Sequence, residues 1–177
     1  MTPTEQLRNE HQAVLLALDI LAKICQKSEA GEKLAPKHQE EILEFIKIFI
    51  DKCHHGKEEG LLFPAMEKVG IPKEQGPIGM MIKEHDMGRE FVRGMSENIS
   101  NPEKFIGNAR GYIELLRQHI EKENNILYEM ADMHISQTKN NELLKEFNKL
   151  ELERIGPGKH EEFHQMLEKL AGIYLKQ

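Results

Sequence analysis

Apolar residues recur every three or four positions along four long stretches of this 177-residue chain, a period typical of amphipathic helices. The first stretch opens with "TPTE", a capping box with Pro3 at the first helical position, and Gly31 ends it. Pro64 is expected to end or kink the second stretch. The four stretches cover roughly residues 2–29, 36–63, 78–99 and 101–130.

Short links rich in glycine and proline separate these stretches, and no segment has the alternating pattern of a strand. The sequence therefore predicts an all-α fold, an up-down-up-down four-helix bundle with two additional shorter C-terminal helices at about 138–154 and 159–175. We expect residues 1–135 to form the bundle. Residues 136–177 are expected to form a C-terminal helical extension packed on it.

The net charge of −6 argues against a nucleic-acid partner, because such proteins need a basic surface. No apolar stretch reaches the length of a membrane span, and the N-terminus lacks the pattern of a secretory signal. Two cysteines are too few for a disulfide framework. Together these features predict a cytoplasmic protein with no membrane partner.

Several polar residues lie inside the apolar stripes, where they would face the core. A helical wheel turns by about 100° per residue, which places His54 and Glu58 near the buried side of the second helix. The same wheel places His55 about 140° away from Ile50 and sends it, with Glu59, toward solvent. The residues predicted on buried stripes are His11, His54, Glu58, His85, His119 and Glu123.

An internal repeat supports this choice. "HHGKEEGLLF" from His54 aligns without gaps with "HIEKENNILY" from His119, so that Lys57 matches Lys122. The first and third helices agree in turn, because "NEH" ends at His11 and "KEH" ends at His85. The chain thus reads as two copies of a helix pair, each with a lone histidine followed by His-x-x-x-Glu.

Four histidines and two glutamates inside a core would be costly without a partner, and a metal removes that cost. Six donors are too many for one zinc ion, which takes about four. Mixed imidazole and carboxylate donors suit two iron ions, with the glutamates bridging them. A lone buried histidine is more often hydrogen-bonded than metal-bound, so the prediction rests on the whole set.

This set resembles the hemerythrin-like family of di-iron four-helix bundles over about residues 5–134, through "NEHQ", "HHGKEEGLLFP", "KEHD" and "HIEKENNILY". The resemblance implies that the same six residues bind two iron ions. It also extends to bacterial members implicated in repair of iron–sulfur clusters. Those carry a further N-terminal cysteine-bearing domain, whereas this chain opens at the first helix, which weakens the expectation of that role.

The oxygen carriers of the family have His-x-x-x-His on the third helix, but here Arg89 takes the second position. This departure argues against reversible oxygen carriage. His55, His160 and His164 are candidates to fill the missing position, although each is more simply read as a surface or packing histidine. For Arg89 we expect a place at the bundle edge, paired with a carboxylate such as Glu10 or Glu90. The alternative is that Arg89 points at the open coordination position and stabilises an anionic ligand there.

Three functions remain open from the sequence. The protein could bind or sense oxygen, nitric oxide or peroxide at the iron centre. It could instead be a di-iron enzyme acting on one of these molecules, or could store or donate iron for iron–sulfur cluster repair. No residue pattern decides between them.

Overall fold

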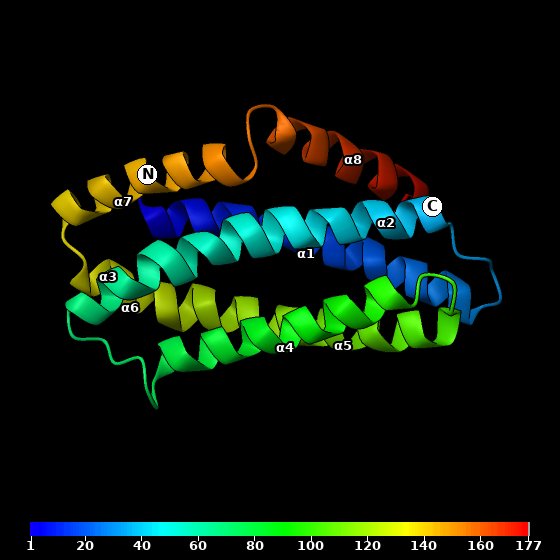
Figure 1. Cartoon of the computed structure of the whole chain (residues 1–177), viewed down its shortest axis with the longest axis horizontal. Helices are drawn as coiled ribbons and strands as arrows, with labels where there is room; N and C mark the ends of the chain where they lie inside the picture. Colours follow the sequence, from blue (N-terminus) through cyan, green and yellow to red (C-terminus); the bar gives the residue numbers. More distant parts are fainter. Residues whose placement is uncertain (177) are drawn as a thin grey trace.

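The computed structural model describes residues 1–176, and every regular element in that range is a helix (Figure 1). This confirms the all-α prediction. The first element, α1 (Pro3–Glu29), has the predicted capping box, in which the Thr2 side chain accepts from the Glu5 amide. The other α-helices are α2 (Pro36–Phe45), α3 (Phe63–Lys68), α4 (Pro77–Glu97), α5 (Pro102–Lys122), α6 (Tyr128–His134), α7 (Gln137–Arg154) and α8 (Lys159–Tyr174).

Three π-helical segments interrupt the predicted α-helices. They are η1 (Ile46–His55), η2 (Glu58–Leu62) and η3 (Glu123–Leu127). Because η2 and η3 begin at positions that match in the internal repeat, the repeat extends to backbone geometry. Each π turn holds one more residue than an α turn, so side chains beyond it change direction.

Pro64 was expected to end or kink the second helix, and it does not end it. The chain stays helical from Pro36 into α3, and Pro64 lies in the first turn after η2. Proline has no N–H, so this position of the continuous helix donates no backbone hydrogen bond.

Helices α1, α2, α4 and α5 run along the length of the molecule, with α4 beside α5 on one side and α7 and α8 on the opposite side (Figure 1). Helix α8 packs on α1 and α2, while α7 packs on η1, η2 and α1. The division at residue 135 stays a prediction. No described helix is both long and apolar enough to cross a bilayer.

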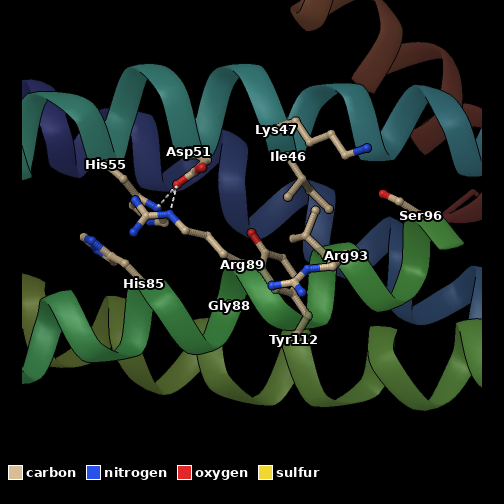
Figure 2. Close-up of a pocket in the computed structure, with 11 residues that line it drawn as sticks. Ile46, Lys47, Asp51, His55, His85, Gly88, Arg89, Arg93, Ser96 and Tyr112 are labelled. Atoms are coloured by element: carbon tan, nitrogen blue, oxygen red, sulfur yellow. Dashed lines mark hydrogen bonds and ion pairs between the residues drawn. The ribbon is translucent and has the colours of Figure 1, made fainter.

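Two apolar clusters fill the interior, and the polar residues predicted inside the stripes lie between them. One cluster includes Leu18, Phe45 and Leu116, and the other includes Leu7, Phe63 and Leu127. A cavity of about 270 Å³ opens beside this polar layer, between η1 and α4, with Tyr112 of α5 as a third wall (Figure 2).

Candidate metal centre

The six residues predicted from the stripes come together in the middle of the molecule, and all are at most 2% exposed. Together with His55 they form two groups of potential metal ligands that share Glu58. One group is His11, His54, Glu58 and Glu123, and the other is His55, Glu58, His85 and His119. Within each group the ligand atoms lie within 4.8 Å of one another.

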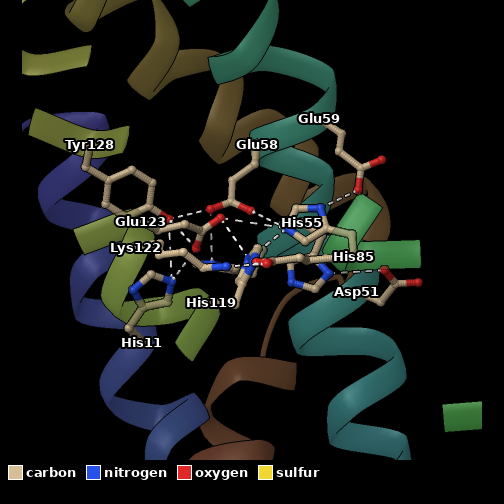
Figure 3. Close-up of polar contacts among 12 residues, drawn as sticks. His11, Asp51, His55, Glu58, Glu59, His85, His119, Lys122, Glu123 and Tyr128 are labelled. Carbon is tan, nitrogen blue, oxygen red and sulfur yellow. Dashed lines mark hydrogen bonds and ion pairs between the residues drawn. The ribbon is translucent and has the colours of Figure 1, made fainter. Parts of the chain in front are cut away.

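The carboxylates of Glu58 and Glu123 occupy the centre, between Tyr128 and His11 on one side and His55 and His85 on the other (Figure 3). The Nε2 atoms of His11 and His119 lie 3.1 and 2.9 Å from Glu123 oxygens. The Nε2 atom of His85 lies 3.2 Å from Glu58 Oε2. The imidazoles therefore turn one nitrogen each toward the two carboxylates.

The outer nitrogens of the first group are held by neighbouring helices. His11 Nδ1 is 2.8 Å from Asn124 Oδ1, and His54 Nδ1 is 3.1 Å from Glu10 Oε1. An oxygen at this position accepts a hydrogen bond from Nδ1–H and leaves the Nε2 lone pair free.

The second group repeats this arrangement. His85 Nδ1 is 2.8 Å from Glu59 Oε2, and His119 Nδ1 is 2.9 Å from Glu84 Oε1. In proteins, metal-binding histidines almost always donate their other N–H to such an oxygen. All four predicted histidines thus have the orientation that metal binding needs.

His55 is where the helical-wheel prediction was wrong. It is only 5% exposed, and its ring stacks on His85 with centroids 3.7 Å apart. Its Nδ1 lies 3.3 Å from Asp51 Oδ1, so it too has an outer carboxylate partner. The π-helical turns of η1 explain the error, because they change the direction that a 100° wheel assigns to this residue. Glu59, also expected toward solvent, is partly buried against His85.

The residues present fit a metal. His54 Nε2, Glu58 Oε2 and Glu123 Oε1 are buried, and within residues 1–176 none makes a hydrogen bond of good geometry. Histidine nitrogens lie 3.2 Å from Glu58 Oε2 and 2.9 Å from Glu123 Oε1, but they meet these oxygens at unfavourable angles. Native structures rarely leave such groups unpaired, and a cation would satisfy all three. The hydroxyl of Tyr128 donates to Glu58 and lies 3.3 Å from Glu123, which orients the carboxylates from the opposite side.

Charges in the metal-free centre balance one another. Burial lowers the pKa of His54, but Glu58 and Glu10 more than offset this and raise that pKa to about 10. Burial raises the pKa of Glu58, and the nearby Glu123 charge raises it too, yet the histidines hold it at about 2. Burial and the His85 charge lower the pKa of His55 well below its ordinary value, which keeps that ring neutral.

A second set of polar partners was not predicted. Lys57 is fully buried, and its Nζ lies 2.9 Å from Glu10 Oε2 and 3.0 Å from Glu151 Oε1 of α7. The matching lysine in the repeat, Lys122, contacts Glu84 in the same way. The match of the two lysines in the repeat is a sequence signal that could have indicated the contacts with Glu10 and Glu84, but it gives no indication of Glu151.

His160 and His164 do not join the central cluster. His160 Nε2 lies 2.9 Å from Glu151, close to Cys53, but the buried ammonium of Lys57 already supplies the positive charge there. We interpret this third group as an ion-pair network. His164 is exposed and pairs with Glu168 on α8.

Arg89 lies at the molecular edge, as expected, but its partners differ from those predicted. Its guanidinium contacts Asp51 at 2.8 Å, Glu59 at 2.6 Å and Asp86 at 2.8 Å, instead of Glu10 or Glu90. A guanidinium stays protonated and cannot bind a metal. Arg89, one helical turn after His85 on α4, therefore contributes no ligand. The ring of His55 from η1 lies beside His85 instead.

The fold and this centre define a class: an all-helical protein with a buried histidine and carboxylate cluster suited to cations. Comparison with known sequences gives the family. The profile of the hemerythrin HHE cation-binding domain matches residues 2–131, and the chain belongs to this family.

Individual relatives share the name iron–sulfur cluster repair protein YtfE. The protein from Yersinia pseudotuberculosis is 34% identical over 88 residues, covering 44% of this chain and 40% of the relative. The protein from Edwardsiella ictaluri is 29% identical over 131 residues, covering 68% of this chain and 59% of the relative. The chain thus spans about half the length of these relatives. No solved structure matches it.

Proposed function

We propose that this protein holds two iron ions and binds a small ligand, namely oxygen, nitric oxide or peroxide, at that centre. In this proposal α1, α2 with its π-helical continuation, α4 and α5 form the four-helix bundle around the metals. His11, His54, Glu58, His85, His119 and Glu123 are the ligands, with His55 as an additional one. Bound iron would supply open coordination positions for the small ligand.

One observation carries the proposal. Five buried histidines each have a carboxylate or amide oxygen beside Nδ1, and they converge on two carboxylates in two ligand groups that share Glu58. A single ion could not use all of these donors, because they exceed the coordination of one tetrahedral site. Imidazole and carboxylate donors together favour iron over calcium or magnesium.

The chain's own residues would prepare the two ligand groups differently. We call the group with His11 and His54 the His11 half of the centre, and the group with His55, His85 and His119 the His85 half. His55 gives the His85 half a third imidazole. Tyr128 places a hydroxyl near the His11 half, with its oxygen 3.4 Å from His11 Nε2. One half therefore offers more imidazoles, and the other offers a proton donor.

Metal analysis tests the proposal. Protein purified from iron-fed cells should contain about two irons per chain, and the His164→Ala variant should match it because His164 lies on the surface. Reduced protein mixed rapidly with oxygen, nitric oxide or peroxide should form a long-lived coloured species with one of them. A single tightly held zinc per chain, with no second site, would contradict the di-iron proposal.

Iron donation is the second candidate, favoured by the name of the relatives, iron–sulfur cluster repair protein. It predicts that iron leaves the protein for an apo iron–sulfur acceptor faster than it leaves for water. Rapid consumption of peroxide without loss of iron would instead favour an enzyme. The same iron-loaded sample distinguishes the three outcomes.

A further inference from the structure

The cavity between η1 and α4 touches the candidate metal centre at one end. His55 and His85 close its inner end, and both are almost fully buried. Its outer end lies between Lys47 and Arg93, which are exposed. The cavity thus leads from the surface to two rings of the same ligand group (Figure 2).

The volume is larger than a diatomic molecule requires. A water molecule occupies roughly 30 Å³ of liquid, and an engineered cavity of about 150 Å³ accommodates benzene. At about 270 Å³, this cavity has room for a substituted aromatic ring or a branched chain of similar size. Ile46 of η1 and Val92 of α4 both line it, and Gly88 has no side chain to fill the α4 side.

Two hydroxyls line the cavity without a partner. Tyr112 is 2% exposed, and within residues 1–176 its hydroxyl makes no side-chain hydrogen bond; Figure 2 shows it directed toward the space between the helices. Its oxygen is not fully enclosed by protein atoms, whereas Ser96 Oγ is fully buried and unpaired. The Tyr112 hydroxyl can therefore be reached from the cavity, and a molecule that supplies an oxygen would accept its hydrogen bond.

The charges along the cavity wall around Arg89 disfavour an anion. Arg89 is the cation on this wall, but Asp51, Glu59 and Asp86 surround its guanidinium. Three carboxylates against one guanidinium leave this wall negative. Arg93 is paired with Glu90, and the Lys47 ammonium extends toward the outer rim in Figure 2. An uncharged ligand meets no such repulsion.

We propose that this cavity binds an uncharged organic alcohol or hydroperoxide, with its oxygen accepting a hydrogen bond from Tyr112 and its apolar body between Ile46 and Val92. The ligand would lie beside His55, at the edge of the metal centre. The inference deepens the proposed function by naming a class of molecule larger than a diatomic. It rests on that function only for the chemistry that the iron would perform after the ligand has bound.

Phenol and cumene hydroperoxide are suitable probes, and toluene and benzoate are their matched comparisons. Calorimetric titration of the iron-loaded protein should give tighter binding of both probes than of either comparison. Tyr112→Phe should weaken phenol binding about fivefold and leave toluene unchanged, since one hydrogen bond is lost. Tyr174→Phe removes a hydroxyl that contacts His38 outside the cavity, and should have no effect.

Val92→Phe should fill the cavity and weaken both probes at least tenfold. Wild-type binding of toluene or benzoate as tight as that of phenol would overturn the proposal, as would an unchanged affinity in Val92→Phe. Cumene hydroperoxide failing to bind would exclude the hydroperoxide class. Iron is counted in the same samples. Iron-loaded protein that does not bind phenol refutes only the cavity ligand, and protein from iron-fed cells that contains no iron yet binds phenol refutes only the metal centre.

Discussion

Replacing Lys57 with methionine should destabilise the protein far more than the same change at Lys122. The two lysines match in the internal repeat, and each contacts a glutamate that accepts from a histidine of the centre. Their surroundings differ, because Lys57 is 0% exposed and the Lys122 side chain is 34% exposed. The pair is therefore a matched test of what burial adds to one contact.

The size of each loss depends on the groups that the substitution leaves unpaired. Without Lys57, Glu10 keeps only His54 and remains 8% exposed, so a carboxylate loses its ammonium inside the protein. Removing one partner of a buried ion pair costs about 3–5 kcal/mol. Glu151 contributes little to this cost, because it is more exposed and keeps His160. At Lys122 water can replace the ammonium, so the expected loss is roughly 1 kcal/mol or less.

Urea unfolding of the metal-free variants, followed by circular dichroism, measures both losses. Lys57→Met should lower the free energy of unfolding by several kcal/mol with an unchanged slope, and Lys122→Met should leave the midpoint nearly in place. Equal losses would refute the reasoning, since they would mean that Lys57 is solvated in the native state. A smaller slope of the unfolding free energy against urea concentration would indicate a loosened fold instead of a broken ion pair.

Other consequences concern the metal centre directly. His54→Ala should empty the His11 half, whereas His55→Ala should keep metal there and weaken only the His85 half; equal metal contents in both variants would contradict this. In metal-free protein the pKa values of His54, His85 and His119 are raised to about 10, 11 and 9. A histidine whose pKa is raised by folding stabilises the folded protein fully below its ordinary pKa of about 6.5, and this stabilisation is lost as the pH rises toward the raised pKa. The urea concentration at the unfolding midpoint should therefore fall between pH 7 and pH 10. A constant midpoint would show that these rings are neutral. Tyr128→Phe should leave Glu58 short of a donor and destabilise the metal-free protein by about 1–3 kcal/mol, measured by the same unfolding.

The sequence was enough to locate the centre because the pattern that marks it lies within single helices. His54 and Glu58 lie on an apolar stripe, and the repeat places His119 and Glu123 in the same way. The structure brings them together, while their role as ligands stays a proposal. The all-helical class followed from the same periodicity.

The misses share a physical cause, which is that they depend on geometry beyond one regular helix. The wheel sends His55 to solvent because it assumes α turns where the backbone has π turns. The ion pair between Lys57 and Glu151 depends on where α7 packs, and no local pattern gives that. Glu10 lies next to His11 in the sequence, but it contacts His54 on another helix.

The π-helical segments also set how this chain should be aligned with others. A π turn contains about one residue more than an α turn, so a relative with an unbroken α-helix in this region needs fewer residues. A gap placed inside 46–55 would keep His54 and Glu58 in register, whereas an ungapped alignment would shift both of them out of register. Removing one residue upstream of His54, for example Ile48, is thus a gentler change than its helical setting suggests.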